Sequence, residues 1–156
     1  MAITIETALA RESIREQLAQ YSMLLDGDGI RRDPESWAKR LFMPDATFVL
    51  HYPDGSEQYR IEGSEAIGKT FGRASSKTAA RHFMVNTVFD ELTATTAKTR
   101  TSALIQVSRR DLDCAKKEGA LNGGQPVLSV LIVYHDTWML DGGEWKKKLS
   151  VLRRDT

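Results

Sequence analysis

The chain has 156 residues, of which 41% are hydrophobic and 28% are charged, and its 22 basic and 21 acidic side chains leave a net charge of +1. These totals predict one globular domain spanning residues 1–156 and argue against a disordered chain. The near balance of charge lacks the basic footprint of a nucleic-acid-binding protein, and no stretch approaches the roughly 18 apolar residues of a membrane span.

Three helices are predicted, all in the first half of the chain. Between Glu6 and Asp26, apolar side chains recur at spacings of 4, 3 and 4, which indicates an amphipathic helix: Ile14, Leu18, Tyr21 and Leu25. A short second helix begins at Asp33-Pro34, passes through Trp37 and Leu41, and is expected to stop at Pro44. A third helix begins at Gly63 with Ser64 and Glu65.

The remaining segments have the alternating pattern of strands. A hairpin is predicted from Ala46–Tyr52 and Gln58–Ile61. Four long strands follow, which we expect to form one antiparallel sheet: Arg81–Leu92, Thr96–Arg109, Val127–Leu140 and Glu144–Leu152. The polar segment Asp111–Gln125 is predicted as an extended hairpin connection, and the run Lys146-Lys147-Lys148 as a guard on an edge strand.

Helices followed by long strands indicate an α+β fold. In such a fold the N-terminal helices pack against one face of a curved antiparallel sheet. A strongly bent sheet leaves a hollow between itself and the helices, and apolar hollows with a few polar groups are where small ligands bind. The sequence therefore predicts one internal ligand pocket.

Asp26 and His82 are the first candidates for chemistry. Asp26 falls in the last turn of the first helix, where the helix dipole disfavours a carboxylate by a few tenths to about 1 kcal/mol. Histidine is the side chain best matched to proton transfer near neutral pH. Two plainer interpretations stay open. Asp26 could start a solvated Asp-Gly turn, and a lone strand histidine is more often a hydrogen-bonded structural residue.

Alternation along the strands supplies further candidates. By the period-2 rule His82, Met84, Asn86 and Val88 share one face, and the sequence does not say which face is the inner one. Tyr134, Asp136 and Trp138 share a face of a later strand. That face could line a pocket, or it could be a solvated face with aromatic cross-strand pairs.

No metal or cofactor is expected. His51, His82 and His135 lack the spacing of metal ligands, and the single cysteine, Cys114, offers no thiolate cluster. No nucleotide-binding or serine-hydrolase motif occurs. With no disulfide and no export signal at the N-terminus, we expect a cytoplasmic protein.

Taken in order, these segments resemble the SnoaL-like branch of the nuclear-transport-factor-2-like superfamily, over about Ile14 to Arg153. The motifs that carry the resemblance are Tyr21 with Leu25-Asp26, Trp37 with Leu41-Phe42-Met43-Pro44-Asp45-Ala46, Glu62-Gly63, His82-Phe83-Met84-Val85-Asn86, Tyr134-His135-Asp136-Thr137-Trp138 and Asp141-Gly142-Gly143-Glu144-Trp145. The resemblance implies a cone-shaped sheet of the cystatin-like α+β barrel type. It does not fix the function, because this fold serves several chemistries as well as plain binding.

Within that superfamily, Asp26 and His82 resemble the dyad of scytalone dehydratase, hexachlorocyclohexane dehydrochlorinase and bile-acid dehydratase. The resemblance implies that His82 removes a proton from carbon and that Asp26 orients it. We expect the substrate to meet tyrosines and a polar strand face: Tyr21, Tyr52, Asn86, Tyr134, Asp136 and Trp138. Leu25 stands where scytalone dehydratase has a tyrosine, so no single member's substrate is carried over.

The expected function is that of a cofactor-free lyase or isomerase. Its substrate would be a small cyclic, mostly apolar molecule of polyketide, steroid or terpenoid type. By analogy with the family, we expect a homodimer or homotrimer. Two alternatives remain: a non-catalytic domain that binds a metabolite in the same pocket, and the small β subunit of a ring-hydroxylating dioxygenase, which would require an iron-containing partner chain.

Overall fold

The computed structural model describes residues 4–27, 29–109 and 128–154, so Cys114 and the predicted connection Asp111–Gln125 lie outside the described residues. The elements follow one another in the order α1 (Ile5–Asp26), α2 (Gly29–Arg32), α3 (Pro34–Leu41), β1 (Phe42–His51), β2 (Glu57–Glu62), α4 (Ser64–Lys77), β3 (Thr78–Leu92), β4 (Thr96–Arg109), β5 (Leu128–Asp141) and β6 (Glu144–Arg154). Among these described elements, no helix is both long and apolar enough to cross a membrane.

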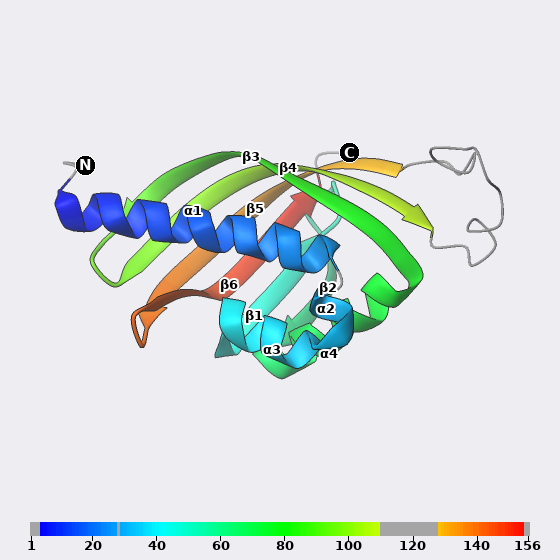
Figure 1. The fold of residues 1–156 in the computed structure, drawn as a ribbon. Helices are drawn as coiled ribbons and strands as arrows, with labels where there is room; N and C mark the ends of the chain where they lie inside the picture. The colour runs from blue at the N-terminus through cyan, green and yellow to red at the C-terminus, as the bar shows by residue number, and fades with distance from the viewer. Residues whose placement is uncertain (1–3, 28, 110–127, 155–156) are drawn as a thin grey trace, which may run out of the picture.

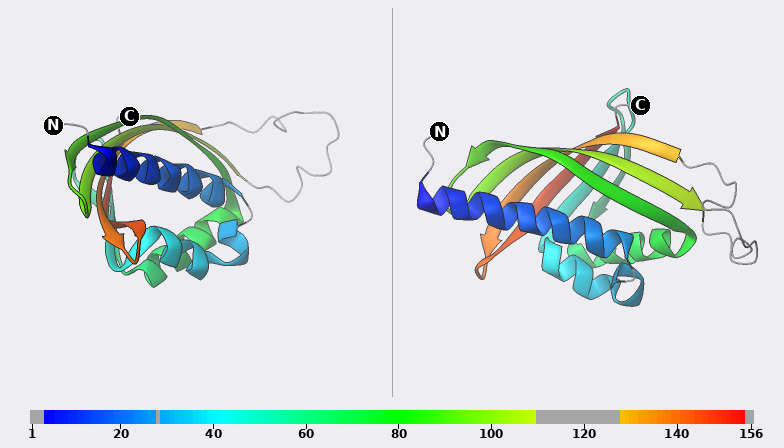
Figure 2. Two further views of the ribbon diagram at one scale, coloured as in Figure 1. Left: turned by 60° about the vertical axis from the view of Figure 1, so that its left-hand side comes forward. Right: turned by 45° about the horizontal axis from the view of Figure 1, so that its top comes forward.

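The strands form one curved, six-stranded sheet in the order β2-β1-β6-β5-β4-β3. The four long strands pair antiparallel, as predicted. β1 runs parallel to β6, so the sheet as a whole is mixed rather than wholly antiparallel. The long α1 lies across the concave side, and the three short helices gather beneath the same side (Figures 1 and 2). The expected α+β architecture with N-terminal helices on a bent sheet is confirmed.

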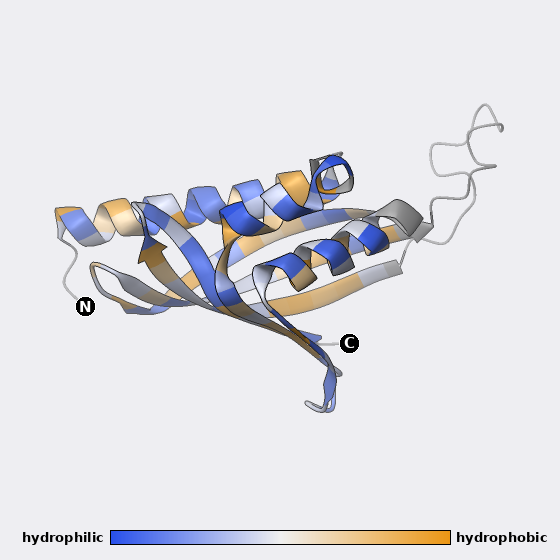
Figure 3. Ribbon diagram, turned by 90° about the horizontal axis from the view of Figure 1, so that it is seen from below, coloured by the Kyte–Doolittle hydropathy of each residue, from blue (hydrophilic) through white to orange (hydrophobic). Residues whose placement is uncertain are grey.

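Helix α1 buries the predicted apolar stripe. Ile14, Leu18, Tyr21 and Leu25 are all at most 7% exposed. Apolar and polar residues alternate along the helix (Figure 3). The first half of the stripe packs with Trp138 in one core cluster. Tyr21 and Leu25 belong to a second, larger cluster with the short helices and the strands. The pocket described below opens within this second cluster.

The start of β1 differs from the prediction. We expected the second helix to run on to Pro44, but α3 ends at Leu41 and the strand begins at Phe42, whose backbone is already extended. Pro44 lies inside β1, where the register with β6 shifts between Phe42 and Thr47. A proline is tolerated there because an irregular stretch of strand does not need its missing N–H.

β-bulges in β3 and β6 change which side chains face inward. In β3 the register with β4 shifts between Met84 and Asn86, so Val85 is an extra residue and the alternation reverses beyond it. The prediction that Asn86 and Val88 share a face with His82 is therefore wrong: both are exposed, and Thr87 and Phe89 point inward instead.

A bulge also lies in β6, where Trp138 faces Lys147 but Thr137 faces Leu149. The extra residue is Lys148, and it lets Trp145 and Lys147 point inward at one end of the strand, with Ser150 and Leu152 at the other. The interpretation of the lysine run as an edge-strand guard is wrong. β6 is an inner strand, and the side chain of Lys147 is fully buried.

Candidate active site

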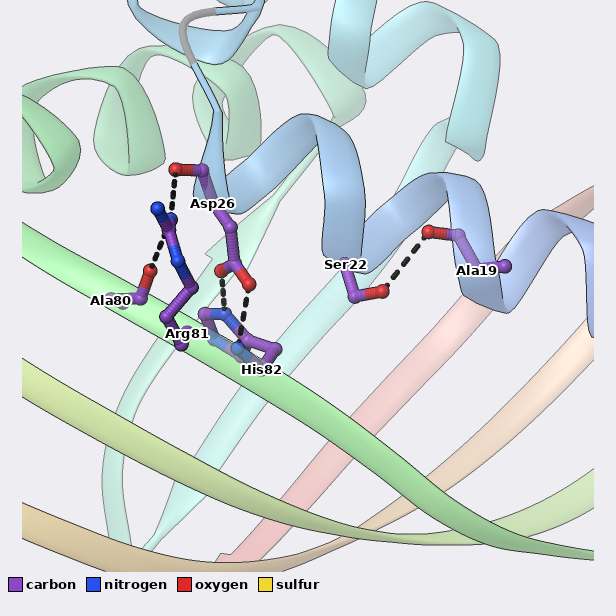
Figure 4. A network of polar contacts seen from close by, with 6 residues as sticks. All are labelled: Ala19, Ser22, Asp26, Ala80, Arg81 and His82. Carbon is purple, nitrogen blue, oxygen red and sulfur yellow. Dashed lines mark hydrogen bonds and ion pairs between the residues drawn. The ribbon is translucent and has the colours of Figure 1, made fainter.

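The carboxylate of Asp26 and the imidazole of His82 meet between the end of α1 and the start of β3 (Figure 4). Asp26 Oδ1 is hydrogen-bonded to Nδ1 of His82. Asp26 Oδ2 accepts the backbone N–H of the same histidine at 2.7 Å. The side chain of His82 is only 9% exposed, and that of Asp26 is 13% exposed. The carboxylate therefore fixes both the position and the rotation of the ring.

Arg81 compensates for the unfavourable position of Asp26 at the C-terminal end of a helix. Its Nη1 donates to the main-chain oxygen of Asp26 at 2.9 Å and to that of Ala80 at 3.2 Å. The last turn of α1 itself has no basic residue. A cation that caps the last carbonyls offsets the negative end of the helix dipole, which would otherwise repel the Asp26 carboxylate.

The hydrogen bond to Asp26 determines which nitrogen of His82 can act as a base. An ionised carboxylate can only accept, so Nδ1 carries the proton when Asp26 is charged. In the neutral ring, Nε2 then holds the lone pair. His82 is one of the residues that line the pocket described next.

The pocket has a volume of about 320 Å³ and is mostly apolar. This volume is at the lower end of the range for small-molecule sites. Its apolar lining comes from the strands β1, β4, β5 and β6 and from α4: Phe48, Leu50, Ile105, Val107, Val130, Ile132, Leu152 and Phe71. The polar groups on it are Tyr21, Tyr59, His82, Tyr134 and Arg154. A few polar groups in an apolar hollow are suited to orienting a small, largely apolar molecule.

Tyr21 and Tyr134 form a pair of buried hydroxyls beside His82. Their rings are 6.0 Å apart in an edge-on arrangement, and the Tyr21 ring lies 6.4 Å from that of His82. The two side chains share a hydrogen bond, and burial raises the pKa of each phenol above its ordinary value. Both phenols therefore stay protonated, and since they share one bond, one O–H hydrogen remains for a ligand.

Asp136 and Trp138 are inside the protein, but they bind protein groups rather than line the pocket. Asp136 pairs with Lys147 at 2.9 Å and accepts a hydrogen bond from Ser150 Oγ at 2.5 Å. Trp138 Nε1 donates to Thr99 Oγ1 at 2.9 Å. The ammonium of Lys147 lies 4.2 Å from the centre of the Tyr21 ring. Lys147 of this ion pair therefore packs against the ring of Tyr21.

The other two predicted binding residues lie away from the pocket. Tyr52 follows the end of β1 and is 45% exposed. Asn86 lines a separate surface groove between α1 and β3. Sequence reasoning missed two polar pocket residues, Tyr59 and Arg154. Arg154 could have been found only with the register of β6 known, because it shares the inward face with the buried Leu152.

Within the described ranges, no group of three or more histidine, cysteine, aspartate and glutamate side chains could hold a metal ion. What the arrangement can do is move a proton. It combines an oriented imidazole, a buried carboxylate and a phenol donor at the wall of one apolar pocket.

Comparisons with solved structures show the same fold in several other proteins. A candidate scytalone dehydratase from Novosphingobium aromaticivorans superposes with a TM-score of 0.74 at 24% identity, over 99% of this chain and 89% of that one. The β subunit of a candidate aromatic-ring-hydroxylating dioxygenase from the same organism gives 0.70 at 16% identity, over 96% and 91%. ActVI-ORFA from Streptomyces coelicolor gives 0.65 at 14% identity, over 94% and 97%.

At these identities the likeness establishes the fold and leaves the function open. No curated protein matches the sequence significantly. The family model of the SnoaL-like domain, however, matches residues 6–149, from the start of α1 into β6. The match includes both members of the Asp26–His82 pair. The chain belongs to the SnoaL-like domain family.

Proposed function

We propose that the protein is a cofactor-independent enzyme of the lyase or isomerase type. Its substrate is a small, cyclic, mostly apolar molecule with an oxygen function on the ring. The observation that carries the proposal is the Asp26–His82 hydrogen bond in the wall of an apolar pocket of about 320 Å³. A base with a fixed tautomer, shielded from water and facing a ligand site, is an arrangement suited to abstracting a proton from carbon.

In the reaction, Nε2 of His82 takes a proton from the carbon next to a carbonyl group. The electron pair of the broken C–H bond moves onto the carbonyl oxygen, which becomes an enolate. Asp26 stabilises the imidazolium that forms, because its carboxylate is hydrogen-bonded to Nδ1 and only 13% exposed. The enzyme thus holds the proton and the compensating negative charge in one place.

The Tyr21–Tyr134 pair supports the enolate. Its unshared O–H hydrogen donates to the oxygen that gains negative charge, and the raised pKa of both phenols keeps that hydrogen in place. Tyr52, one of the tyrosines expected from the sequence to meet the substrate, is too exposed to serve in the pocket. Tyr134 takes its place in this proposal.

The proton held by His82 then completes either of two balanced reactions. Returned to a different carbon, it gives an isomer of the substrate. Donated to a hydroxyl group on the β-carbon, it releases water and leaves a double bond, which is a dehydration. Neither route requires an external oxidant, reductant or cofactor. Both pass through the same first step, so proton removal is the step to test.

The test is deuterium exchange into 1-tetralone, a bicyclic ketone with acidic hydrogens next to its carbonyl group. We expect the protein to accelerate exchange of these hydrogens in D2O, as followed by proton NMR. His82→Gln should reduce the protein-dependent rate by about 10²- to 10⁴-fold, the usual contribution of a positioned general base. The variant should keep its fold, since the glutamine amide is also polar and of similar length.

The matched control is His135→Gln, because His135 lies in β5 with its side chain on the opposite face from Tyr134 and Asp136. This variant should exchange deuterium at the wild-type rate. Equal rates in the wild type and His82→Gln would refute the proposal. Binding of 1-tetralone without any accelerated exchange would instead favour the non-catalytic binding domain.

A further inference from the structure

Arg154 places a permanent positive charge on the wall of the apolar pocket. It is the last described residue of β6, and its side chain is partly buried. Its Nε is buried and has no hydrogen-bond partner among the described residues. None of the described residues that line the pocket is acidic. A guanidinium in apolar surroundings is costly unless a negative group pairs with it.

Tyr59 adds a second donor beside Arg154. Burial raises the pKa of the Tyr59 phenol, and the nearby charge of Arg154 acts in the opposite direction. The phenol ring stacks on Phe48, with the two ring centres 6.2 Å apart and the planes 18° from parallel. The stack fixes the ring on β2, close to the end of β6. The pocket wall thus carries two neighbouring hydrogen-bond donors, Tyr59 and Arg154.

His82 is on the other side. It belongs to β3, an edge strand, whereas Arg154 belongs to β6, and two strands, β4 and β5, lie between them. With neighbouring strands about 4.8 Å apart, the two backbones are separated by about 14 Å along the sheet. A ring system bound across the pocket meets the base at one end and the cation at the other.

We infer that Arg154, assisted by Tyr59, binds a carboxylate or similar anionic group that the substrate carries at the end away from the reacting carbon. The inference rests on the proposed function only in assuming that the substrate occupies this pocket. The planar guanidinium fork matches the two oxygens of a carboxylate, and such a bond is stronger where water is excluded. The substrate class is therefore an acidic, otherwise apolar ring compound.

The experiment compares two probes of the same size and shape, 2-naphthoate and its neutral analogue 2-naphthamide, by isothermal titration calorimetry at pH 7.5 and low salt. The wild type should bind the carboxylate about 10- to 100-fold more tightly than the amide, the usual effect of a charge-assisted hydrogen bond. Arg154→Gln should lose that preference while its affinity for the amide stays within about threefold of the wild type.

Arg153→Gln is the matched control, since Arg153 is the exposed neighbour on the opposite face of β6 and the substitution removes the same charge. It should keep the preference for the carboxylate, which separates a local contact from a general effect of net charge. A wild type without the preference, or an Arg154→Gln variant that retains it, would overturn the inference.

His82→Gln distinguishes this inference from the proposed function. Binding is measured without turnover, so His82→Gln should still prefer 2-naphthoate even though it has lost deuterium exchange. A preference that disappears in His82→Gln and persists in Arg154→Gln would place the anion at the dyad and overturn the assignment to Arg154. Failed exchange with an intact, Arg154-dependent preference would refute the catalytic proposal alone.

Discussion

Asp26 holds His82 at two points, with one carboxylate oxygen on the ring nitrogen Nδ1 and the other on the backbone N–H. The two residues are 56 positions apart in the chain and come from a helix end and a strand start. The backbone contact locks the strand against the helix. The ring contact then fixes the orientation of the imidazole in the wall of the pocket.

Replacing Asp26 with asparagine should reverse the tautomer of His82. The amide oxygen can still accept the backbone N–H, but the amide NH2 group then faces Nδ1 and needs a lone pair there. The proton moves to Nε2, which can no longer act as a base. We expect deuterium exchange to fall by about 10²-fold or more, and nitrogen-15 NMR of the imidazole should show a protonated Nε2. An unprotonated Nε2 with normal exchange would contradict this mechanism.

The sequence predicts the framework of the site better than its lining. The apolar stripe of α1 repeats every 3.6 residues, and the long strands alternate every 2 residues. Both elements can therefore be recognised from the residues of the segment itself. Asp26 and His82 were singled out by the unusual place of a carboxylate at a helix end and by the resemblance to a family dyad. Their contact itself is long-range, and only the structure shows that it forms.

β-Bulges and strand order explain where the predictions for Asn86 and Lys147 are wrong. One inserted residue at Val85 reverses the faces of β3 as far as Phe89, so Asn86 points outward, and nothing in the local pattern marks the insertion. Lys147 was misassigned for a related reason, because strand order is a property of the whole sheet. A lysine run suits an edge strand, but β6 lies between β1 and β5.

The buried pair Asp136–Lys147 predicts a sharp difference between neighbouring lysines. Lys147→Met should lower the free energy of unfolding by about 3–5 kcal/mol, because it leaves a buried carboxylate without its counter-charge. The double variant Asp136→Asn with Lys147→Met should recover much of that loss. Urea denaturation measures both values.

Lys148→Met is the control for that series. Lys148 pairs with the exposed Asp45 at the surface, and surface pairs contribute at most about 1 kcal/mol. Equal losses in Lys147→Met and Lys148→Met would show that the pair does not act as a buried one. A double variant as unstable as Lys147→Met would show that packing, and not the unpaired charge, sets the cost.

Gly68 sets the distance between α4 and the start of α3. A Cβ atom at this position would lie 2.4 Å from the main-chain oxygen of Pro34 and 2.9 Å from the Cβ of Ala38. Gly68→Ala should therefore destabilise the protein by about 1–3 kcal/mol, even though alanine favours helices over glycine by about 1 kcal/mol. It should also weaken ligand binding, because α4 carries Phe71 into the pocket. Thr70→Ala, on the exposed side of the same helix, should change stability by less than about 0.5 kcal/mol.

The buried phenol of Tyr21 predicts how stability depends on alkaline pH. Burial raises its pKa in the folded state well above the ordinary value of 10.0, which the unfolded chain retains. Below pH 10 the phenol is protonated in both states, so its contribution to stability is fully present. Above pH 10 the unfolded chain releases a proton that the folded protein keeps, so this contribution falls by up to about 1.4 kcal/mol per pH unit.

Tyr21→Phe removes the titrating group, and its unfolding free energy in urea should decline less steeply than that of the wild type between pH 10 and 11. Parallel curves for the two proteins would mean that the Tyr21 hydroxyl is accessible to water, and would remove it as the protonated partner of Tyr134.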